Sequence, residues 1–214
     1  MQKPSATVLL GLVAVALVLS ALAFVRWRAA TAIIEIGFWY ENFPVTLPQD
    51  HVIRLGGPLT DVDIDLIKRV SREELERAFS GLRIAVTDRR DAIWRIRVVY
   101  DIPRGPSGMV PRGPQSGEMR TIGFLGATGA VEFQTLSFAA FHYAPEGATR
   151  DDIIRGIGRG IGRTAVHEFG HAMALLGHSD DPLSYEAGSW DRAAQYYGEL
   201  HWASWPLLAE RFGK

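Results

Sequence analysis

Residues 163–179 read RTAVHEFGHAMALLGHS, and this segment constrains how the rest of the chain must fold. His167 and His171 are four residues apart, and residues at that spacing share one face of a helix. Both imidazoles can therefore reach one ion, with Glu168 beside it. The pattern His-Glu-x-x-His is typical of zinc hydrolases, in which the glutamate is a general base. The segment predicts a helix that carries a metal site.

A third histidine follows this pair. His178 comes seven residues after His171 and directly after Gly177. Glycine readily adopts the left-handed conformation that ends a helix, so we expect Gly177 to turn the chain and bring His178 to the same ion. Two downstream carboxylates, Glu186 and Glu199, are the alternative third ligands.

These residues resemble the zinc-binding segment of the metzincin metallopeptidases, and most closely that of the matrixin branch. The family pattern is His-Glu-x-x-His-x-x-Gly-x-x-His, and the segment here reads HEFGHAMALLGHS. The resemblance implies that His167, His171 and His178 bind Zn2+ and that Glu168 is the catalytic base. It also implies an α+β catalytic domain with a twisted, mostly parallel or mixed sheet, a long active-site helix and a small C-terminal helical subdomain.

The segment departs from the family pattern at three points. Ala174 occupies the position of the family's turn glycine, and one extra residue separates the second and third histidines. The family also has a methionine turn beneath its metal, but no methionine follows Met173. Residues 181–185 (DPLSY) resemble that turn, with Ser184 in the position of the methionine.

The composition excludes several classes of protein. The chain has 214 residues, enough for one domain with a sizeable core, and its formal net charge of −1 gives no reason to expect nucleic acid as a partner. It contains no cysteine, which excludes disulfides, cysteine-ligated zinc and the cysteine-based self-inhibition of some matrixins. The sequence does not predict an oligomeric state.

An uncharged segment near the N-terminus, residues 5–25, predicts contact with a membrane. A helix of this length spans about 30 Å, the thickness of the hydrocarbon core of a bilayer. Lys3 and residues 26–28 (RWR) flank it as interfacial anchors. We expect residues 1–28 to be a single-pass transmembrane anchor with an extracytoplasmic domain. Residues 21–23 (ALA) resemble a cleavage site, so the alternative is a signal segment and a secreted protein.

Prolines and glycines predict that residues 29–60 are a connector, with a strand beginning near residue 33. Residues 61–214 are expected to form the zinc peptidase domain. Periodicity predicts a helix over residues 61–79, capped by Thr60 or Asp61. Strands are expected at residues 82–86, 93–100, 122–125, 130–135 and 137–143.

Two of the remaining segments are expected to bear on a substrate. Residues 137–143 are our candidate for the sheet edge along which a substrate strand pairs, and His142 within them is expected to be structural. Residues 103–118, rich in proline and glycine, are expected to be a solvated loop, with a mobile lip of the substrate cleft as the alternative.

A second capping pattern, Thr149 with Asp152, predicts that the metal-site helix begins there and runs to about residue 175. Its glycine-rich first half allows close packing on the sheet, or else the helix begins near Arg163. Arg155, Arg159 and Arg163 form a stripe at four-residue spacing that we expect to be solvated.

The C-terminal residues predict two helices. Ser189 is expected to cap a short one that ends at Gly198. The last carries Trp202, Trp205 and several leucines, and it either packs on an aromatic surface or lies on the bilayer. Tyr185, near the turn, is expected in the core.

Together these patterns predict a membrane-tethered or exported zinc metalloendopeptidase that acts on peptides or proteins. Zinc would supply an activated water, and Glu168 would take its proton. The missing turn methionine and Ala174 motivate an alternative, a catalytically inactive, membrane-anchored binding domain that retains zinc.

Overall fold

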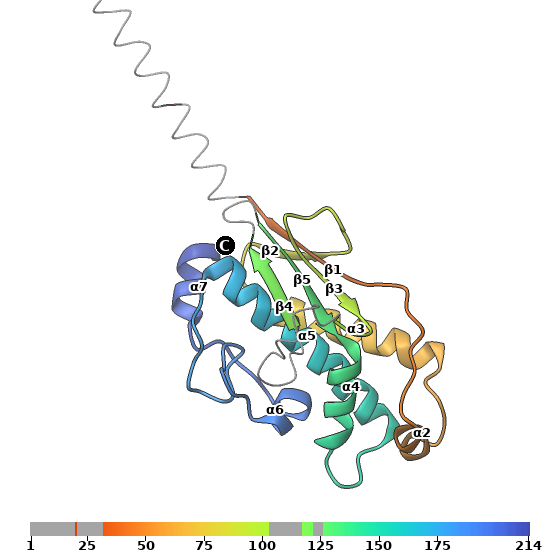
Figure 1. Cartoon of the computed structure of the whole chain (residues 1–214). Coiled ribbons are helices and arrows are strands. Elements are labelled where there is room, and N and C mark those ends of the chain that lie inside the picture. Colours follow the sequence, from red (N-terminus) through yellow and green to blue (C-terminus); the bar gives the residue numbers. More distant parts are fainter. Residues whose placement is uncertain (1–19, 21–31, 103–116, 122–125) are drawn as a thin grey trace, which may run out of the picture.

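A computed structural model describes residues 20, 32–102, 117–121 and 126–214 of the chain (Figure 1). The predicted anchor, residues 1–28, lies outside the described residues except for residue 20, as do residues 103–116 and the strand expected at 122–125. Within the described part, no helix combines the length and the apolar character needed to cross a bilayer. The elements are β1 (Ile34–Tyr40), α2 (Gln49–Leu55), α3 (Asp61–Ala78), β2 (Ile84–Thr87), β3 (Trp94–Val99), β4 (Gly117–Thr121), β5 (Ala127–Glu132), α4 (Phe133–His142), α5 (Arg150–Ala174), α6 (Arg192–Tyr197) and α7 (Trp205–Phe212).

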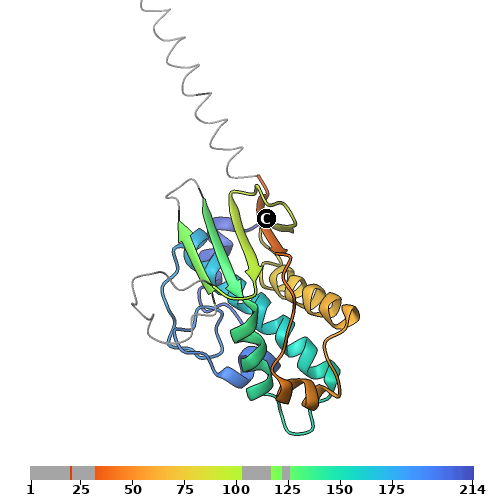
Figure 2. The ribbon, with the colours of Figure 1, turned by 45° about the vertical axis from the view of Figure 1, so that its right-hand side comes forward.

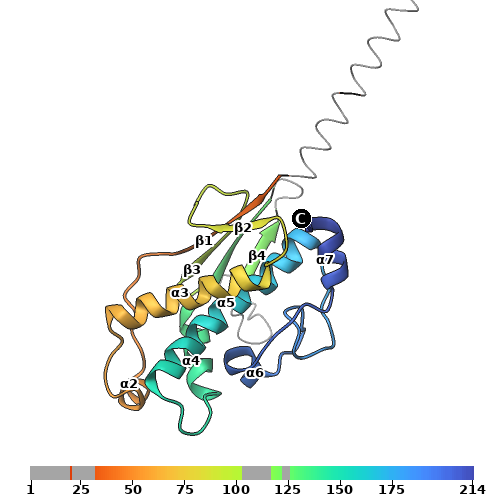
Figure 3. The same ribbon diagram turned by 180° about the vertical axis from the view of Figure 1, so that it is seen from behind.

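The strands form one sheet in the order β2-β1-β3-β5-β4. Strands β2, β1, β3 and β5 are parallel, and β4 pairs antiparallel with β5 at the edge. Helices α3 and α5 lie side by side against one face of this sheet (Figures 2 and 3). The fold is therefore α+β with a mixed, mostly parallel sheet, as predicted. Because β1 lies between two other strands, part of the segment expected to be a connector belongs to the sheet.

Helix α3 begins and packs as its sequence predicts. The Thr60 hydroxyl accepts a hydrogen bond from the Asp63 N–H at 3.3 Å, and the Asp63 carboxylate accepts one from the Thr60 N–H at 2.7 Å. This reciprocal pair satisfies amide groups that the first helical turn leaves free. The helix buries Ile67, Val70 and Leu75, and α5 is its main neighbour.

The predicted capping box of α5 is also present, between Thr149 and Asp152, so the helix begins at Arg150 rather than near Arg163. Its glycines do allow close packing, but not on the sheet. Gly158 and Gly162 face α3, and Gly156 and Gly160 face the tyrosines of α6. A Cβ atom on Gly162 would lie 2.5 Å from the carbonyl oxygen of Ser71, too close for any side chain. The absence of side chains along this face lets the two helix backbones approach each other.

The strand predicted at residues 137–143 is wrong, because residues 137–142 belong to α4 and Tyr143 caps this helix. Phe133, Leu136, Ser137, Ala140 and Phe141 are buried, and their spacing of three or four residues is that of a helix. His142 is exposed at the end of this helix. Among the described strands, β2 and β4 form the two edges of the sheet.

The C-terminal part forms α6 and α7. Helix α6 is capped by Asp191 rather than by Ser189, since the Asp191 carboxylate accepts a hydrogen bond from the Ala194 N–H at 3.0 Å. Trp202 and Leu208 are buried, so this region packs on the core. It contributes the turn that lies beneath the histidines.

Candidate metal centre

The structure brings the three histidines of the motif together. His167 and His171 lie on α5, one turn apart, and His178 follows the end of that helix. One ligand nitrogen from each lies within 4.8 Å of the other two, so the three could hold a metal ion. His167 and His171 are half-buried and His178 is exposed, so the cluster opens to solvent on the His178 side.

Backbone carbonyl groups orient the two helical imidazoles. His167 Nδ1 lies 2.7 Å from the carbonyl oxygen of Tyr185, and His171 Nδ1 lies 2.6 Å from that of Leu176. A carbonyl oxygen only accepts hydrogen bonds, so each Nδ1 carries the proton and each neutral Nε2 presents a lone pair. The two Nε2 atoms are 2.9 Å apart. Two lone pairs this close repel each other unless a cation lies between them, so the donor set fits a metal ion.

Burial keeps His167 in the form that can bind a metal. It lowers the pKa of His167 to about 4, against the opposing effect of the hydrogen bond to Tyr185. The neighbouring His171 and His178 lower this pKa further. The imidazole is therefore neutral at pH 7.

The turn after α5 is made by leucine, and the prediction that Gly177 makes it is wrong. Among the described residues, Leu175 is the one non-glycine residue with a positive φ, 53°, and Gly177 is not among the positive-φ glycines. The left-handed residue lets the Leu176 N–H donate to the Gly170 carbonyl oxygen at 3.4 Å. In this arrangement the Leu176 carbonyl points back to His171.

Residues 181–185, which resemble the methionine turn, do lie beneath the cluster, because Tyr185 supplies the carbonyl that holds His167. Ser184 is fully buried at the methionine position. Its hydroxyl oxygen accepts hydrogen bonds from the Glu186 N–H at 3.0 Å and the Ala203 N–H at 3.4 Å. Hydrogen bonds thus fix this turn.

Two aromatic residues complete the support of the turn. The Tyr185 ring is buried and lies 5.1 Å from the ring of Trp202, as expected of a core residue. The Trp190 ring lies 4.9 Å from that of His167, and its indole N–H donates to the Ser184 carbonyl oxygen at 2.7 Å. Trp190 was not predicted as part of the site, because no local pattern in the sequence links it to the histidines.

The two carboxylates considered as alternative ligands are engaged elsewhere. Glu186 is buried and accepts hydrogen bonds from the N–H and the hydroxyl of Ser204, at 3.0 and 2.9 Å. Glu199 forms an ion pair with Arg77 at 3.1 Å. Among the described residues, the one group placed to hold a metal consists of the three histidines.

Glu168, the residue after His167 on α5, contacts the edge strand β4. A Cβ atom on Gly117, the first residue of β4, would be 3.1 Å from Glu168 Oε1, so the edge strand passes directly over this carboxylate. Burial, and secondarily the charge of Glu118, raise the pKa of Glu168 to about 7. A bound cation would lower this pKa again, because it favours the charged form.

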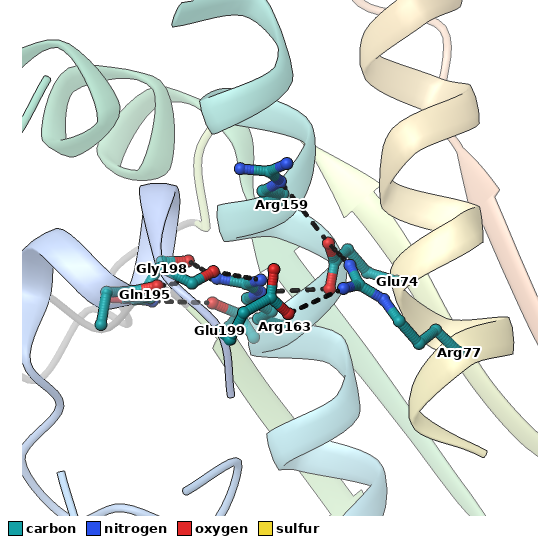
Figure 4. Close-up of polar contacts among 9 residues, drawn as sticks. Glu74, Arg77, Arg159, Arg163, Gln195, Gly198 and Glu199 are labelled. Atoms are coloured by element: carbon teal, nitrogen blue, oxygen red, sulfur yellow. Dashed lines mark hydrogen bonds and ion pairs between the residues drawn. The ribbon is translucent and has the colours of Figure 1, made fainter. Parts of the chain in front are cut away.

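One turn before His167, the side chain of Arg163 is fully buried, so the prediction of a solvated stripe is wrong at this position. Its Nε donates to the Glu74 carboxylate at 3.1 Å. Its other nitrogens donate to the carbonyl oxygens of Ala194, Gln195 and Gly198, at 2.7, 3.1 and 2.9 Å (Figure 4). Arg163 therefore joins α5 to α3 and to the C-terminal part that carries the supporting turn.

Glu74 is the common partner of three arginines. Besides Arg163, it is hydrogen-bonded to Arg77 and lies 3.7 Å from Arg159 (Figure 4). Gly162 and Thr164, on either side of Arg163, are buried as well.

Comparison of the chain with models of protein families, with curated proteins and with solved structures gives no match. The assignment of the site therefore rests on its residues and on their geometry.

Proposed function

We propose that this chain is a zinc-dependent metalloendopeptidase of the metzincin type, with His167, His171 and His178 as ligands and Glu168 as general base. The observation that carries the proposal is the pair of Nε2 atoms 2.9 Å apart, each on an imidazole oriented by a backbone carbonyl. His178 supplies the third nitrogen, and three protein ligands leave one position on zinc for water.

The chemistry divides between the metal and the carboxylate. Zinc, when bound, lowers the pKa of a water molecule to about 7 and polarises the substrate carbonyl. Glu168 accepts the proton of the attacking water and then donates it to the nitrogen of the leaving amine. Its position next to His167 in the chain and its contact with Gly117 of β4 support this role.

The edge strand β4 gives a substrate a place to bind. No described strand pairs with its outer side, and an extended peptide can add there through main-chain hydrogen bonds. Because Gly117 lies against Glu168, a peptide on this edge passes close to the general base. This edge replaces residues 137–143 in our proposal, and the membrane-tethered, extracytoplasmic location remains part of it.

The test compares three variants of the full-length chain in detergent. Glu168→Ala should retain one equivalent of zinc and lower the rate of casein cleavage by about 10²–10⁴-fold, the usual contribution of a general base. His171→Ala should lose both zinc and activity. His142→Ala, an exposed histidine outside the cluster, is the matched control and should change neither.

The alternative is a binding domain with a catalytically inactive zinc centre. Ser184 at the methionine position and Ala174 at the turn glycine are the observations that favour it. Stoichiometric zinc combined with equal, chelator-insensitive cleavage rates for the wild type and Glu168→Ala would leave this alternative and overturn the peptidase proposal.

A further inference from the structure

The two ends of the described chain are tied together by one side chain. Arg83, just before β2, donates to the carbonyl oxygens of Ala32, Gly213 and Arg211, at 3.0, 2.8 and 3.2 Å. The start of β1 and the C-terminus therefore lie side by side at the same end of the sheet (Figures 1 and 3).

The metal-site helix reaches this end as well. Arg211 donates from Nη1 to the carbonyl oxygen of Ala174, the last residue of α5, at 2.5 Å. Two arginines thus connect Ala32, where the chain leaves its N-terminal segment, with the end of the helix that carries His171. His171 lies one helical turn, about 5 Å, from this end.

Large apolar side chains are exposed around these contacts. Ile33 is 67% exposed, Ile93 61%, Leu175 77% and Trp205 39%. Ile33 and Ile93 line one pocket, and Trp205 lies 3.8 Å from the Cβ position of Gly81, two residues before Arg83. We call these four residues the chain-end surface.

The N-terminal segment that precedes Ile33 indicates what covers this surface. Residues 5–25 carry no charge and are long enough to cross a bilayer, and seven residues, 26–32, separate them from Ile33. Seven residues span at most about 25 Å. A domain on so short a tether stays near the lipid. Tryptophan is enriched at membrane interfaces, and isoleucine and leucine favour the apolar acyl region beneath the headgroups.

We propose that the chain-end surface rests on the bilayer and holds the metal centre close to it. Combined with the proposed peptidase function, on which this step rests, the substrates are polypeptide segments that emerge from the same membrane. In this orientation His171 lies about one helical turn from the lipid headgroups. A peptide bond near the headgroups can therefore bind at the metal centre more readily than a bond in a freely diffusing protein.

The absence of cysteine allows a direct measurement of orientation. The full-length chain is reconstituted in phosphatidylcholine vesicles with single cysteines, Ile93→Cys or Leu175→Cys, that carry a nitroxide label. Ile53→Cys and Val62→Cys are the controls, since both residues are exposed and apolar but lie on α2 and at the start of α3, away from the chain ends (Figure 1). Labels at 93 and 175 should be more accessible to oxygen than to a water-soluble nickel complex, and labels at 53 and 62 should show the reverse.

Cleavage measured on the same vesicles separates this inference from the proposed function. A peptide attached to lipid by a short spacer should be cut about tenfold faster than the same free peptide, because tethering raises its effective concentration at the site. Equal nickel accessibility at all four positions, or a chain that does not float with the vesicles, would overturn the orientation even if Glu168-dependent cleavage is found. Lipid contact at 93 and 175 without any cleavage would support the orientation and count against the peptidase.

Discussion

The two halves of α5 serve different tasks within one continuous helix. From Ile153 to Arg163 the helix is almost wholly buried, and its glycines let α3 and the tyrosines of α6 approach closely. From Thr164 onward it presents His167, Glu168 and His171 to a partly open site. The first half contributes packing and the second contributes chemistry.

The comparison shows how a long helix can hold a precise site at one end. The packing half is fixed by backbone approach and by the buried pair of Arg163 and Glu74, so the axis of the helix is defined one turn before His167. The site half is fixed by two carbonyl oxygens that orient the imidazoles. Perturbing each half should therefore affect different properties.

The largest effect on stability should come from Arg163→Met in the packing half. The substitution removes the one donor that the buried Glu74 carboxylate and three carbonyl oxygens share. Breaking a buried ion pair costs about 3–5 kcal/mol, and we expect the lower end of this range because Arg77 and Arg159 still pair with Glu74. Urea unfolding of the metal-free chain measures this cost. Arg155→Met is the matched control on the same stripe, because the ion pair of Arg155 with Asp151 is exposed and contributes less than about 1 kcal/mol. Equal effects of the two substitutions would contradict the division of the helix.

Gly162→Ala should destabilise the chain although alanine favours a helix. The new Cβ would lie 2.5 Å from the Ser71 carbonyl oxygen. The cost of this overpacking exceeds the gain in helix propensity of about 1 kcal/mol, so the free energy of unfolding should fall by about 2 kcal/mol. Gly177→Ala is the control, since no atom lies within 4 Å of its Cβ position and its φ is not positive. A drop in melting temperature for Gly162→Ala alone is expected, and a stabilised Gly162→Ala would mean that the helices are not in close contact there.

The same contrast explains what the sequence could and could not predict. The metal-site half follows from local spacing, because His171 is four residues after His167 and three after Glu168, and residues at these spacings are neighbours on a helix whatever surrounds them. Capping at Thr60 and Thr149 is equally local and was predicted. The burial of Arg163 depends on Glu74, 89 residues away, and no local pattern records that distance.

The turn and the edge strand were missed for similar reasons. Leucine is rarely left-handed, so the pattern favoured Gly177 over Leu175. Residues 137–143 are mostly apolar, and this composition fits either a buried strand or a buried helix. The packing of this segment against α5 favours the helix. The supporting positions of Tyr185 and Trp190 arise from the C-terminal chain folding back beneath α5.

Asp63→Asn tests the first turn of the packing half through pH. Arg150, the first residue of α5, donates to the Asp63 carboxylate at 2.7 Å, and this contact holds the pKa of Asp63 down at about 2. The unfolded value is about 3.9, so the stabilisation is present above about pH 4 and is lost as the pH falls through 2. Because the contact lies near the surface, we expect it to contribute about 1 kcal/mol at pH 7.

Urea unfolding of the metal-free chain from pH 7 down to pH 2 checks this expectation. The difference between Asp63→Asn and the wild type should shrink as the pH falls, because the wild-type carboxyl also becomes neutral. Asp65→Asn, two residues along the same helix, is the control, because the contact of Asp65 with Lys68 is long, 4.0 Å, and exposed. A pH-independent loss for Asp63→Asn would show that the hydrogen bonds, and not the charge, carry the contribution.

The smallest effect is expected at the end of the site half. A left-handed conformation costs a non-glycine residue roughly 1–2 kcal/mol. Glycine removes this strain but adds conformational freedom to the unfolded chain. We therefore expect Leu175→Gly to stabilise the detergent-solubilised, metal-free chain by about 0.5 kcal/mol. Leu183→Gly, at an exposed leucine without a positive φ, should destabilise it slightly and serves as the control. Zinc affinity should be unchanged by Leu175→Gly, because the carbonyl that orients His171 belongs to Leu176. A loss of zinc affinity in Leu175→Gly with no loss in Leu183→Gly would mean that the leucine side chain itself, rather than the backbone turn, positions the site half of the helix.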